Sequence, residues 1–227
     1  MALIPAGSFV MGNDAGRPDE RPAHRVTLAA FRAAVRPVSN AEYALFLSAT
    51  GHEPPPFLDD ERFNAPEQPV VGVIWAAAVA YCRWLASRTR LAFRLPAEAE
   101  REYASLGGLT GADWPWGNEA PSERQELREI AHREQPHAPG AECVNGYGLL
   151  CTADNVHEWC SDWYGADYYA ESPEESPQGP RTGKRRSSRG GSWRHQLKFN
   201  RLSSRSSLDP SFCYNDYGFR VYEEVEA

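Results

Sequence analysis

The spacing of apolar side chains predicts three helices in the first half of the chain. The first opens on the capping-box pair Ser39 and Glu42 and ends before Gly51. The second covers residues 75–88, where apolar positions recur at helical spacing. A third, shorter helix has Pro96 in its first turn and ends at the next glycine pair. All three have the pattern of structural helices.

Short apolar segments predict strands at residues 9–11, 25–28 and 219–222. Two other stretches, 120–141 and 171–186, are polar and charged, and we expect long variable loops there. The expected fold class is therefore α+β with little regular secondary structure.

Composition supports a loop-rich fold. The chain has 227 residues with 18 Gly, 18 Pro and 7 Trp, which favours many turns anchored by aromatic side chains. We see neither an internal repeat nor a linker, so a single domain over residues 1–227 is expected. No apolar run approaches membrane-spanning length, and the N-terminus lacks the pattern of a secretion signal. We therefore expect a cytoplasmic protein without a membrane partner.

The charge is negative overall but uneven along the chain. A net charge of -7 argues against nucleic acid as a partner. The C-terminal third is nevertheless locally basic. Residues 184–186 fit a solvated surface, whereas Arg194, Arg201 and Arg205 are better placed to bind a carboxylate or phosphate. A peptide, a protein or a small anionic ligand is the partner that these arginines suggest.

The cysteine pattern favours reduced thiols. The count is five, which is odd, and no Cys-x-x-Cys pair occurs. Cys82 falls on the inner face of a predicted helix and reads as a core residue. Whether Cys151 and Cys160 pair is left open by the sequence. Cys213 lies in the candidate site segment and is the thiol we would test for reactivity.

The most informative segment lies between two anchors, residues 189–193 (Arg-Gly-Gly-Ser-Trp) and 216–221 (Asp-Tyr-Gly-Phe-Arg-Val). We expect the second anchor to end in the strand at 219–222, with one apolar face. The residues between the anchors are polar, cationic and aromatic, as is typical of a binding or catalytic loop on a rigid scaffold. The candidate ligand-binding residues are Ser192, Trp193, Arg194, His195, Asn200, Arg201, Arg205 and Tyr214. Among them, Trp193 has the stronger character of a core residue.

Further blocks precede the two anchors along almost the whole chain. They are residues 4–12, 37–43, 94–100, 115–118, 145–149 and 155–159. In this order the blocks resemble the sulfatase-modifying-factor family, whose best-known members are formylglycine-generating enzymes. The resemblance implies a variant of the C-type lectin fold, with few regular elements and many ordered loops.

The same resemblance argues against a standard copper-dependent formylglycine generator. Such enzymes carry two cysteines just after the Gly-Gly-Ser block, which bind copper(I) as thiolates. Here the first of those positions falls on His195, and the second on Asn200 or Leu197. Copper is therefore not expected at this site.

Other metals remain open. His195 takes the position of a ligand, and His157 lies in a block expected under the same face of the fold. Two imidazoles with Glu158 or Asp216 would suit a harder metal such as iron(II). The alternative is that both histidines are hydrogen-bonded structural residues. The catalytic candidates are thus His195, His157 and Cys213.

The family resemblance also implies a structural calcium site. The loop Asn145, Gly146 and Gly148 matches the family's Asn-Gly-x-Gly pattern, which binds calcium through oxygen ligands. A tight turn packed by Tyr147 is the alternative. A second family calcium region, near residues 131–133 here, does not match.

Three functions remain open. The first is a divergent, metal-dependent oxidoreductase that acts in the cleft between the two anchors. The second is a non-catalytic ligand- or protein-binding module, such as a diversity-generating variable protein. The third is a true formylglycine-generating oxidase.

Overall fold

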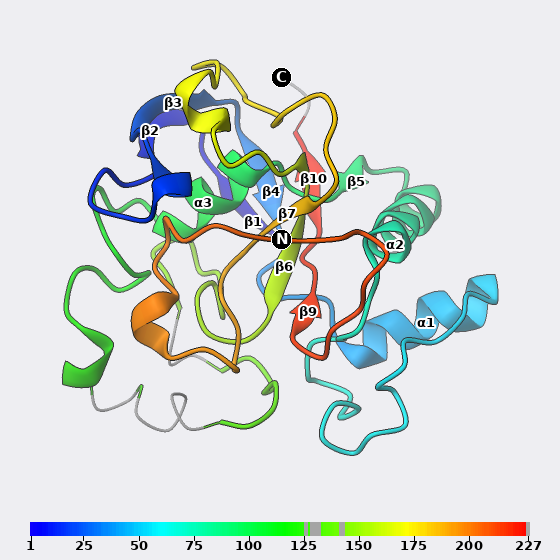
Figure 1. The fold of residues 1–227 in the computed structure, drawn as a ribbon. Coiled ribbons are helices and arrows are strands. Elements are labelled where there is room, and N and C mark those ends of the chain that lie inside the picture. The colour runs from blue at the N-terminus through cyan, green and yellow to red at the C-terminus, as the bar shows by residue number, and fades with distance from the viewer. Residues whose placement is uncertain (125–126, 128–132, 141–143, 226–227) are drawn as a thin grey trace.

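The computed structural model describes residues 1–124, 127, 133–140 and 144–225 of the chain. Within them, short helices and strands are joined by long loops, as expected for a single α+β domain (Figure 1). Part of the expected variable loop 120–141, most of the region near 131–133 and Cys143 lie outside the described residues. No helix in the described part combines the length and the apolar composition needed to cross a bilayer.

One sheet joins the two ends of the chain. Its antiparallel strands lie in the order β1 (Ala2–Ile4), β4 (Phe31–Ala33), β10 (Tyr222–Glu224) and β5 (Phe93–Arg94). Strand β4 pairs with β1 on one side and β10 on the other. The N-terminal and C-terminal segments are therefore fixed side by side.

A two-stranded hairpin stands apart from this sheet. Strand β2 (Gly7–Met11) pairs antiparallel with β3 (His24–Leu28), and these strands confirm the predictions at 9–11 and 25–28. The loop between them contains a one-turn 3₁₀ helix, Pro18–Glu20. Arg17, in the same loop, lines a cavity beside β6.

A third sheet carries the segments that the sequence marked as informative. Its order is β8 (Ser206–Leu208), β7 (Arg186–Arg189), β6 (His157–Trp163) and β9 (Tyr217–Gly218). Strand β6 is antiparallel to β7 but parallel to β9. Because β6 lies between β7 and β9, it brings the two anchors and the block at 155–159 into one place.

The predicted strand at 219–222 is wrong in its bounds. Residues 219–221 form no ladder, and only Tyr222 belongs to a strand. The chain here crosses from the third sheet to the first, and its carbonyls accept single hydrogen bonds from Val38 and Ala34. Arg220 is also fully buried, so this segment has no polar face turned to solvent.

The three predicted helices are present. Helix α1 (Asn40–Thr50) has the expected capping box, and it ends at Gly51, which has a φ of 69°. Helix α2 is Trp75–Thr89. Helix α3 is Glu98–Leu106, so it begins two residues after Pro96, which lies outside the helix rather than in its first turn. Instead, the carboxylate of Glu100 accepts the backbone N–H of Ala97, and this hydrogen bond fixes the helix start.

Three further 3₁₀ turns are described, at Pro121–Glu123, Tyr168–Ala170 and Leu197–Phe199. Helices α1 and α2 pack their aromatic side chains against the third sheet. Tyr81 lies between Tyr43 and Phe219, with ring centroids 5.8 and 5.2 Å away, and Trp159 is fully buried in the same core. Cys82 belongs to this core, as predicted, and no disulfide joins Cys151 to Cys160.

Helix α3 is buried along its whole length, although it carries four charged residues. Glu100 is paired with Arg94, and the other two carboxylates are neutralised by arginines from the C-terminal third. Glu98 accepts from Arg205 at 2.7 and 2.9 Å, and Glu102 is ion-paired with Arg189. Buried charges are tolerated only when they are paired in this way.

The most enclosed of these pairs centres on Glu158 in β6. Its carboxylate accepts from Arg101 of α3 at 2.7 Å and from Arg220 at 2.9–3.2 Å. All three side chains are at most 1% exposed. Arg220 also donates to the carbonyls of Ala34, Val35 and Leu150, at 2.7–2.9 Å. One carboxylate thus joins helix α3, the third sheet and the C-terminal crossing.

We predict that Glu158→Gln lowers the free energy of unfolding by about 3–5 kcal/mol, because it leaves two buried guanidinium groups without their counter-charge. Glu174→Gln is the control, since it removes an exposed pair with Arg25. Urea unfolding of both variants measures the difference. Equal midpoints for the two variants would contradict a central role for Glu158.

Candidate metal-binding site

His157 is placed by the pairing of β6 with β9. It is the first residue of β6 and lies opposite Tyr217, with ring centroids 4.8 Å apart. Its backbone N–H donates to the carbonyl of Asp216 at 2.8 Å. Residues that are distant in sequence therefore meet because one strand pair fixes them.

His195 reaches the same place through the Gly-Gly turn. Gly190 and Gly191 have φ values of 99° and 64°, which favour glycine. A side chain at Gly191 would also overlap that of Asn200. The turn leads the chain back toward β6, so the rings of His157 and His195 lie with centroids 5.1 Å apart, edge to face.

Asp216 completes the group. Its Oδ2 accepts from the hydroxyl of Ser192 at 3.0 Å, and Oδ1 lacks a hydrogen-bond partner among the described residues. The side chain is only 6% exposed, and the nearest cation is Arg194, at 3.8 Å. One potential ligand atom each from His157, His195 and Asp216 lies within 4.8 Å of the others. A buried carboxylate oxygen without a hydrogen bond is costly unless a cation compensates it.

The electrostatic environment keeps His157 neutral. Burial, together with the smaller electrostatic effects of His195, Arg17 and Arg194, lowers the pKa of His157 to about 3. Its Nδ1 has no hydrogen-bond partner among the described residues. A neutral imidazole can offer a lone pair to a metal at physiological pH.

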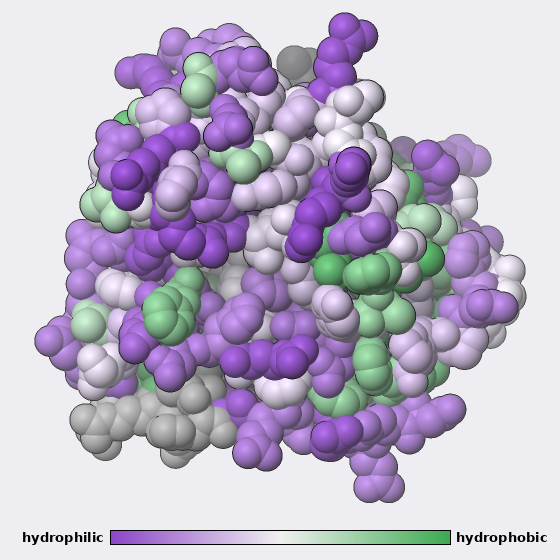
Figure 2. Space-filling model, in the orientation of Figure 1, coloured by the Kyte–Doolittle hydropathy of each residue, from purple (hydrophilic) through white to green (hydrophobic). Residues whose placement is uncertain are grey.

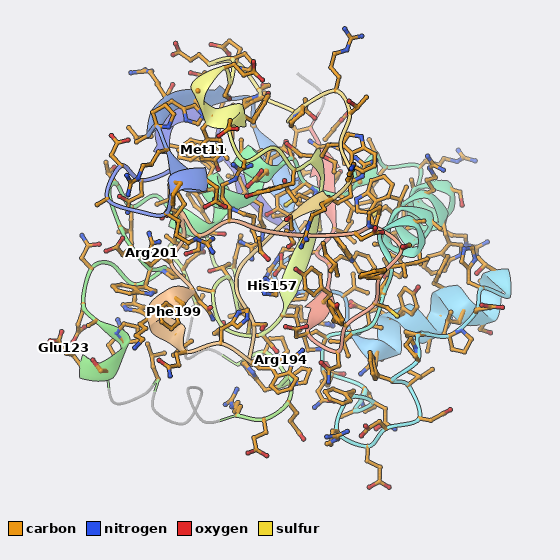
Figure 3. All side chains as sticks on the ribbon, viewed as in Figure 1. Met11, Glu123, His157, Arg194, Phe199 and Arg201 are labelled. Atoms are coloured by element: carbon orange, nitrogen blue, oxygen red, sulfur yellow. The ribbon has the colours of Figure 1, made fainter. Side chains whose placement is uncertain are left out.

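A cavity of about 420 Å³ adjoins this group. His157 and His195 lie on one side of it, and Arg17, Phe199 and Arg201 are among the other lining residues. Figure 3 shows His157 with Arg194, Phe199 and Arg201 around it in this view. The surrounding face is mostly hydrophilic (Figure 2). The cavity is large enough for a side chain or a small organic ligand.

The arginines of the site segment divide into two kinds. Arg201 is bidentate to Glu20, at 2.7 and 2.9 Å, and Arg205 is buried against Glu98. Their donors already serve the scaffold, so the expected free guanidinium forks are not found at these two positions. Arg194 differs, because its side chain is 51% exposed.

Arg17 was not expected at the site. It lies in the loop between β2 and β3, lines the cavity and has a side chain that is 53% exposed. It contacts the site segment by donating to the carbonyl of Arg205. No local sequence pattern pointed to it, since the contact joins residues 188 positions apart.

The remaining predicted site residues differ in burial and in their distance from the cavity. Ser192 is buried and orients Asp216, and Asn200 is buried beneath the Gly-Gly turn. Trp193 packs on Phe63, with ring centroids 6.1 Å apart, which agrees with its expected core character. Tyr214 is 45% exposed and does not line the cavity.

Two candidates stand outside the group of three. Glu158 follows His157 directly, but its carboxylate is turned to Arg101 and Arg220 and is not free to bind a metal. Asp216 is the carboxylate that accompanies the histidines. Cys213 is half-buried and is not part of this group, so the group contains no thiol.

The Asn145 loop is held by internal hydrogen bonds. The Asn145 Oδ1 accepts from the N–H groups of Tyr147 and Leu149, both at 3.0 Å. Its Nδ2 donates to the carbonyls of Ala104 and Ser105 at the end of α3. The Asn145 side chain therefore links the turn to the C-terminal end of α3 by hydrogen bonds. Calcium binding by Asn145, Gly146 and Gly148 stays a prediction.

The pKa of His157 predicts a pH-dependent stability. A histidine has a pKa near 6.5 in an unfolded chain, so as the pH falls the unfolded state takes up the proton first. The stability due to neutral His157 is complete above pH ~6.5 and is lost between there and the folded pKa of about 3. Unfolding free energies measured in chelator at pH 7 and 5 should fall about 2 kcal/mol more for the wild type than for His157→Phe. Parallel pH profiles for the two proteins would contradict the low pKa.

For the Asn145 loop, we predict that Asn145→Ala lowers the free energy of unfolding by about 1–3 kcal/mol, because it leaves buried backbone groups unpaired. Calcium added to the metal-free wild type should not change its melting temperature if the loop is a tight turn, since both Asn145 Oδ1 lone pairs are already used. Asn118→Ala, at an exposed turn residue, is the control. A calcium-dependent rise in melting temperature that Asn145→Ala abolishes would establish the calcium loop instead.

Comparison with known proteins identifies the family of the chain. A family model described as the sulfatase-modifying factor enzyme 1-like domain matches residues 1–225. The formylglycine-generating enzyme of Streptomyces coelicolor is 34% identical over 288 residues, covering 98% of this chain and 88% of that protein.

Solved structures agree. PvdO from Pseudomonas aeruginosa is 27% identical with a TM-score of 0.84, covering 98% of this chain and 93% of that one. Treponema denticola variable protein 1 shares the fold with a TM-score of 0.81 at 23% identity, covering 98% and 94% of the two chains. The expected C-type-lectin-like architecture is thus confirmed. The chain belongs to the sulfatase-modifying-factor family, whose domain accounts for nearly its whole length.

Proposed function

We propose that this chain is a divergent, metal-dependent oxidoreductase of the formylglycine-generating-enzyme family. His157, His195 and Asp216 are the proposed ligands, and iron(II) is the proposed metal. The observation that carries the proposal is the convergence of two imidazoles and one carboxylate beside an open cavity. Two histidines and a carboxylate on one face of a metal are the ligand pattern of non-haem iron(II) oxygenases.

The donor set argues for iron rather than for the copper of related enzymes. Copper(I) in this family relies on thiolates, which are soft ligands, and the proposed group offers only nitrogen and oxygen. Neutral His157 can bind a metal at once, and Ser192 holds Asp216 in position through its hydroxyl. A bound metal would supply one-electron chemistry with dioxygen as the oxidant.

The cavity suggests the chemistry of the substrate. Arg17 and Arg194 are half exposed near the histidines. Arg17 also contacts the carboxylates of Asp19 and Glu20, at 3.6 and 3.2 Å, so Arg194 is the better candidate to meet an anionic ligand. Phe199 lines the same cavity and is 63% exposed. These residues favour a substrate with a carboxylate or phosphate and an apolar portion, such as a peptide side chain or a small anion.

A binding experiment tests the metal site. Anaerobic titration of metal-free protein with iron(II) should fill one equivalent that His195→Ala and Asp216→Asn each lose, because each variant removes one of three ligands. His52→Ala is the control, since His52 is an exposed histidine outside the proposed ligand group. Dioxygen uptake by the iron-loaded protein, with anionic peptides present, then tests the redox step. Retention of iron by both ligand variants would overturn the proposed ligands.

A non-catalytic binding module is the second candidate. Phe199, Phe212 and Tyr214 are 63%, 51% and 45% exposed in the C-terminal segment, and exposed aromatic residues are typical of recognition surfaces. Metal binding separates the two candidates. A protein that binds no metal at His157, yet binds an anionic peptide through Arg194, would support the module.

A further inference from the structure

A second group of ligating side chains lies apart from the His157 site, where residues 133–140 meet the segment before β6. His137 Nε2 lies 3.3 Å from Asp154 Oδ2 and 3.7 Å from Cys151 Sγ. One ligand atom from each of the three residues lies within 4.8 Å of the others. Cys151 and Asp154 are 2% exposed, and the His137 side chain is 10% exposed.

The carboxylate of Asp154 is the strongest indication that this group can bind a cation. Neither of its oxygens has a hydrogen-bond partner among the described residues, although the side chain is only 1% exposed. His137 Nδ1 and the Thr152 hydroxyl also lack partners there. A buried carboxylate with unmet oxygens is expensive, and buried charges of this kind are commonly paired or bind metals.

The backbone around the group is fixed. Asn155, which is fully buried, accepts the N–H of His137 at 3.2 Å and donates to its carbonyl at 2.8 Å. This two-way link holds the His137 segment against the chain that carries Cys151 and Asp154. The three side chains are therefore positioned by the fold rather than by chance contact.

We propose that His137, Cys151 and Asp154 form a zinc site, separate from the proposed iron site at His157. Zinc accepts thiolate, imidazole and carboxylate ligands together, at about 2.0–2.3 Å, so tetrahedral ligand atoms lie roughly 3.3–3.7 Å apart. The distances from His137 Nε2 to Asp154 Oδ2 and to Cys151 Sγ, 3.3 and 3.7 Å, fall in this range. Three protein ligands leave a fourth position for water, reached from the partly exposed side of His137.

The thiol makes the two metal sites distinguishable by spectroscopy. Cobalt(II) substitutes for zinc, and a thiolate ligand gives it an intense near-ultraviolet charge-transfer band. The His157 group contains no thiol, so such a band reports the Cys151 site alone. We expect the reduced, metal-free wild type to show the band with one equivalent of cobalt(II), and excess zinc to remove it.

Variants assign the band to its residues. Cys151→Ser should abolish the band, and Asp154→Asn should weaken cobalt(II) binding at least about tenfold, since even the loss of a supporting contact has that effect. His195→Ala should leave the band unchanged, as should Cys213→Ser, which removes a thiol outside the group. Failure of the iron titration with the cobalt band intact would refute only the function proposed above.

A measurement on the wild type alone guards against misfolded variants. A metal that binds only the folded state raises the melting temperature, so zinc should stabilise the wild type. The competing arrangement is a plain His137–Asp154 ion pair, which requires no metal. Absence of the thiolate band and of any zinc-dependent shift in the wild type would overturn the zinc site, as would a band that survives Cys151→Ser.

Discussion

A single buried carboxylate, Glu158, holds the parts of this loop-rich domain together. Most of its segments have too little regular structure to fix one another by backbone ladders alone. Arg101 and Arg220 converge on Glu158 from α3 and from the C-terminal crossing. Arg220 also donates to three backbone carbonyls, two of which directly follow β4. Loss of the Glu158 carboxylate would therefore disturb both β6 and the first sheet.

Local signals in the sequence predicted local structure well. The capping box at Ser39 and the stop at Gly51 depend on neighbouring residues, and both appear as predicted in α1. The segment 219–222 failed for the opposite reason. The alternation of apolar and polar residues in this segment predicted a strand with one polar face. Arg220 is instead buried, because it pairs with Glu158, a residue 62 positions away in sequence. A buried charge pair of that kind leaves no trace in a hydrophobic pattern.

In the candidate site too, only part of the arrangement could be predicted from the sequence. The resemblance to a family placed His157 and His195 on one face, and the structure brings their rings together with Asp216. Arg17 and His137 could not be found this way. One lies in an irregular loop near the N-terminus, and the other in a stretch whose polar composition predicted only a variable loop. Their roles depend on which loops meet, and that is decided by the packing of the whole chain. The arginine pairs of Arg201 and Arg205 were likewise invisible, since an arginine in an ion pair and a free one look identical in sequence.

The alternation of side chains along β6 has a consequence for substitutions. Successive residues of a strand face opposite sides, so His157 is turned to the cavity and Glu158 to the interior ion pairs. The cavity and the internal ion pairs therefore depend on adjacent residues that contact different neighbours. Mutation can exchange the side chain on the cavity side while Glu158 keeps its contacts with Arg101 and Arg220. Substitution of His157 should therefore alter the cavity without removing the ion pairs that hold the domain together.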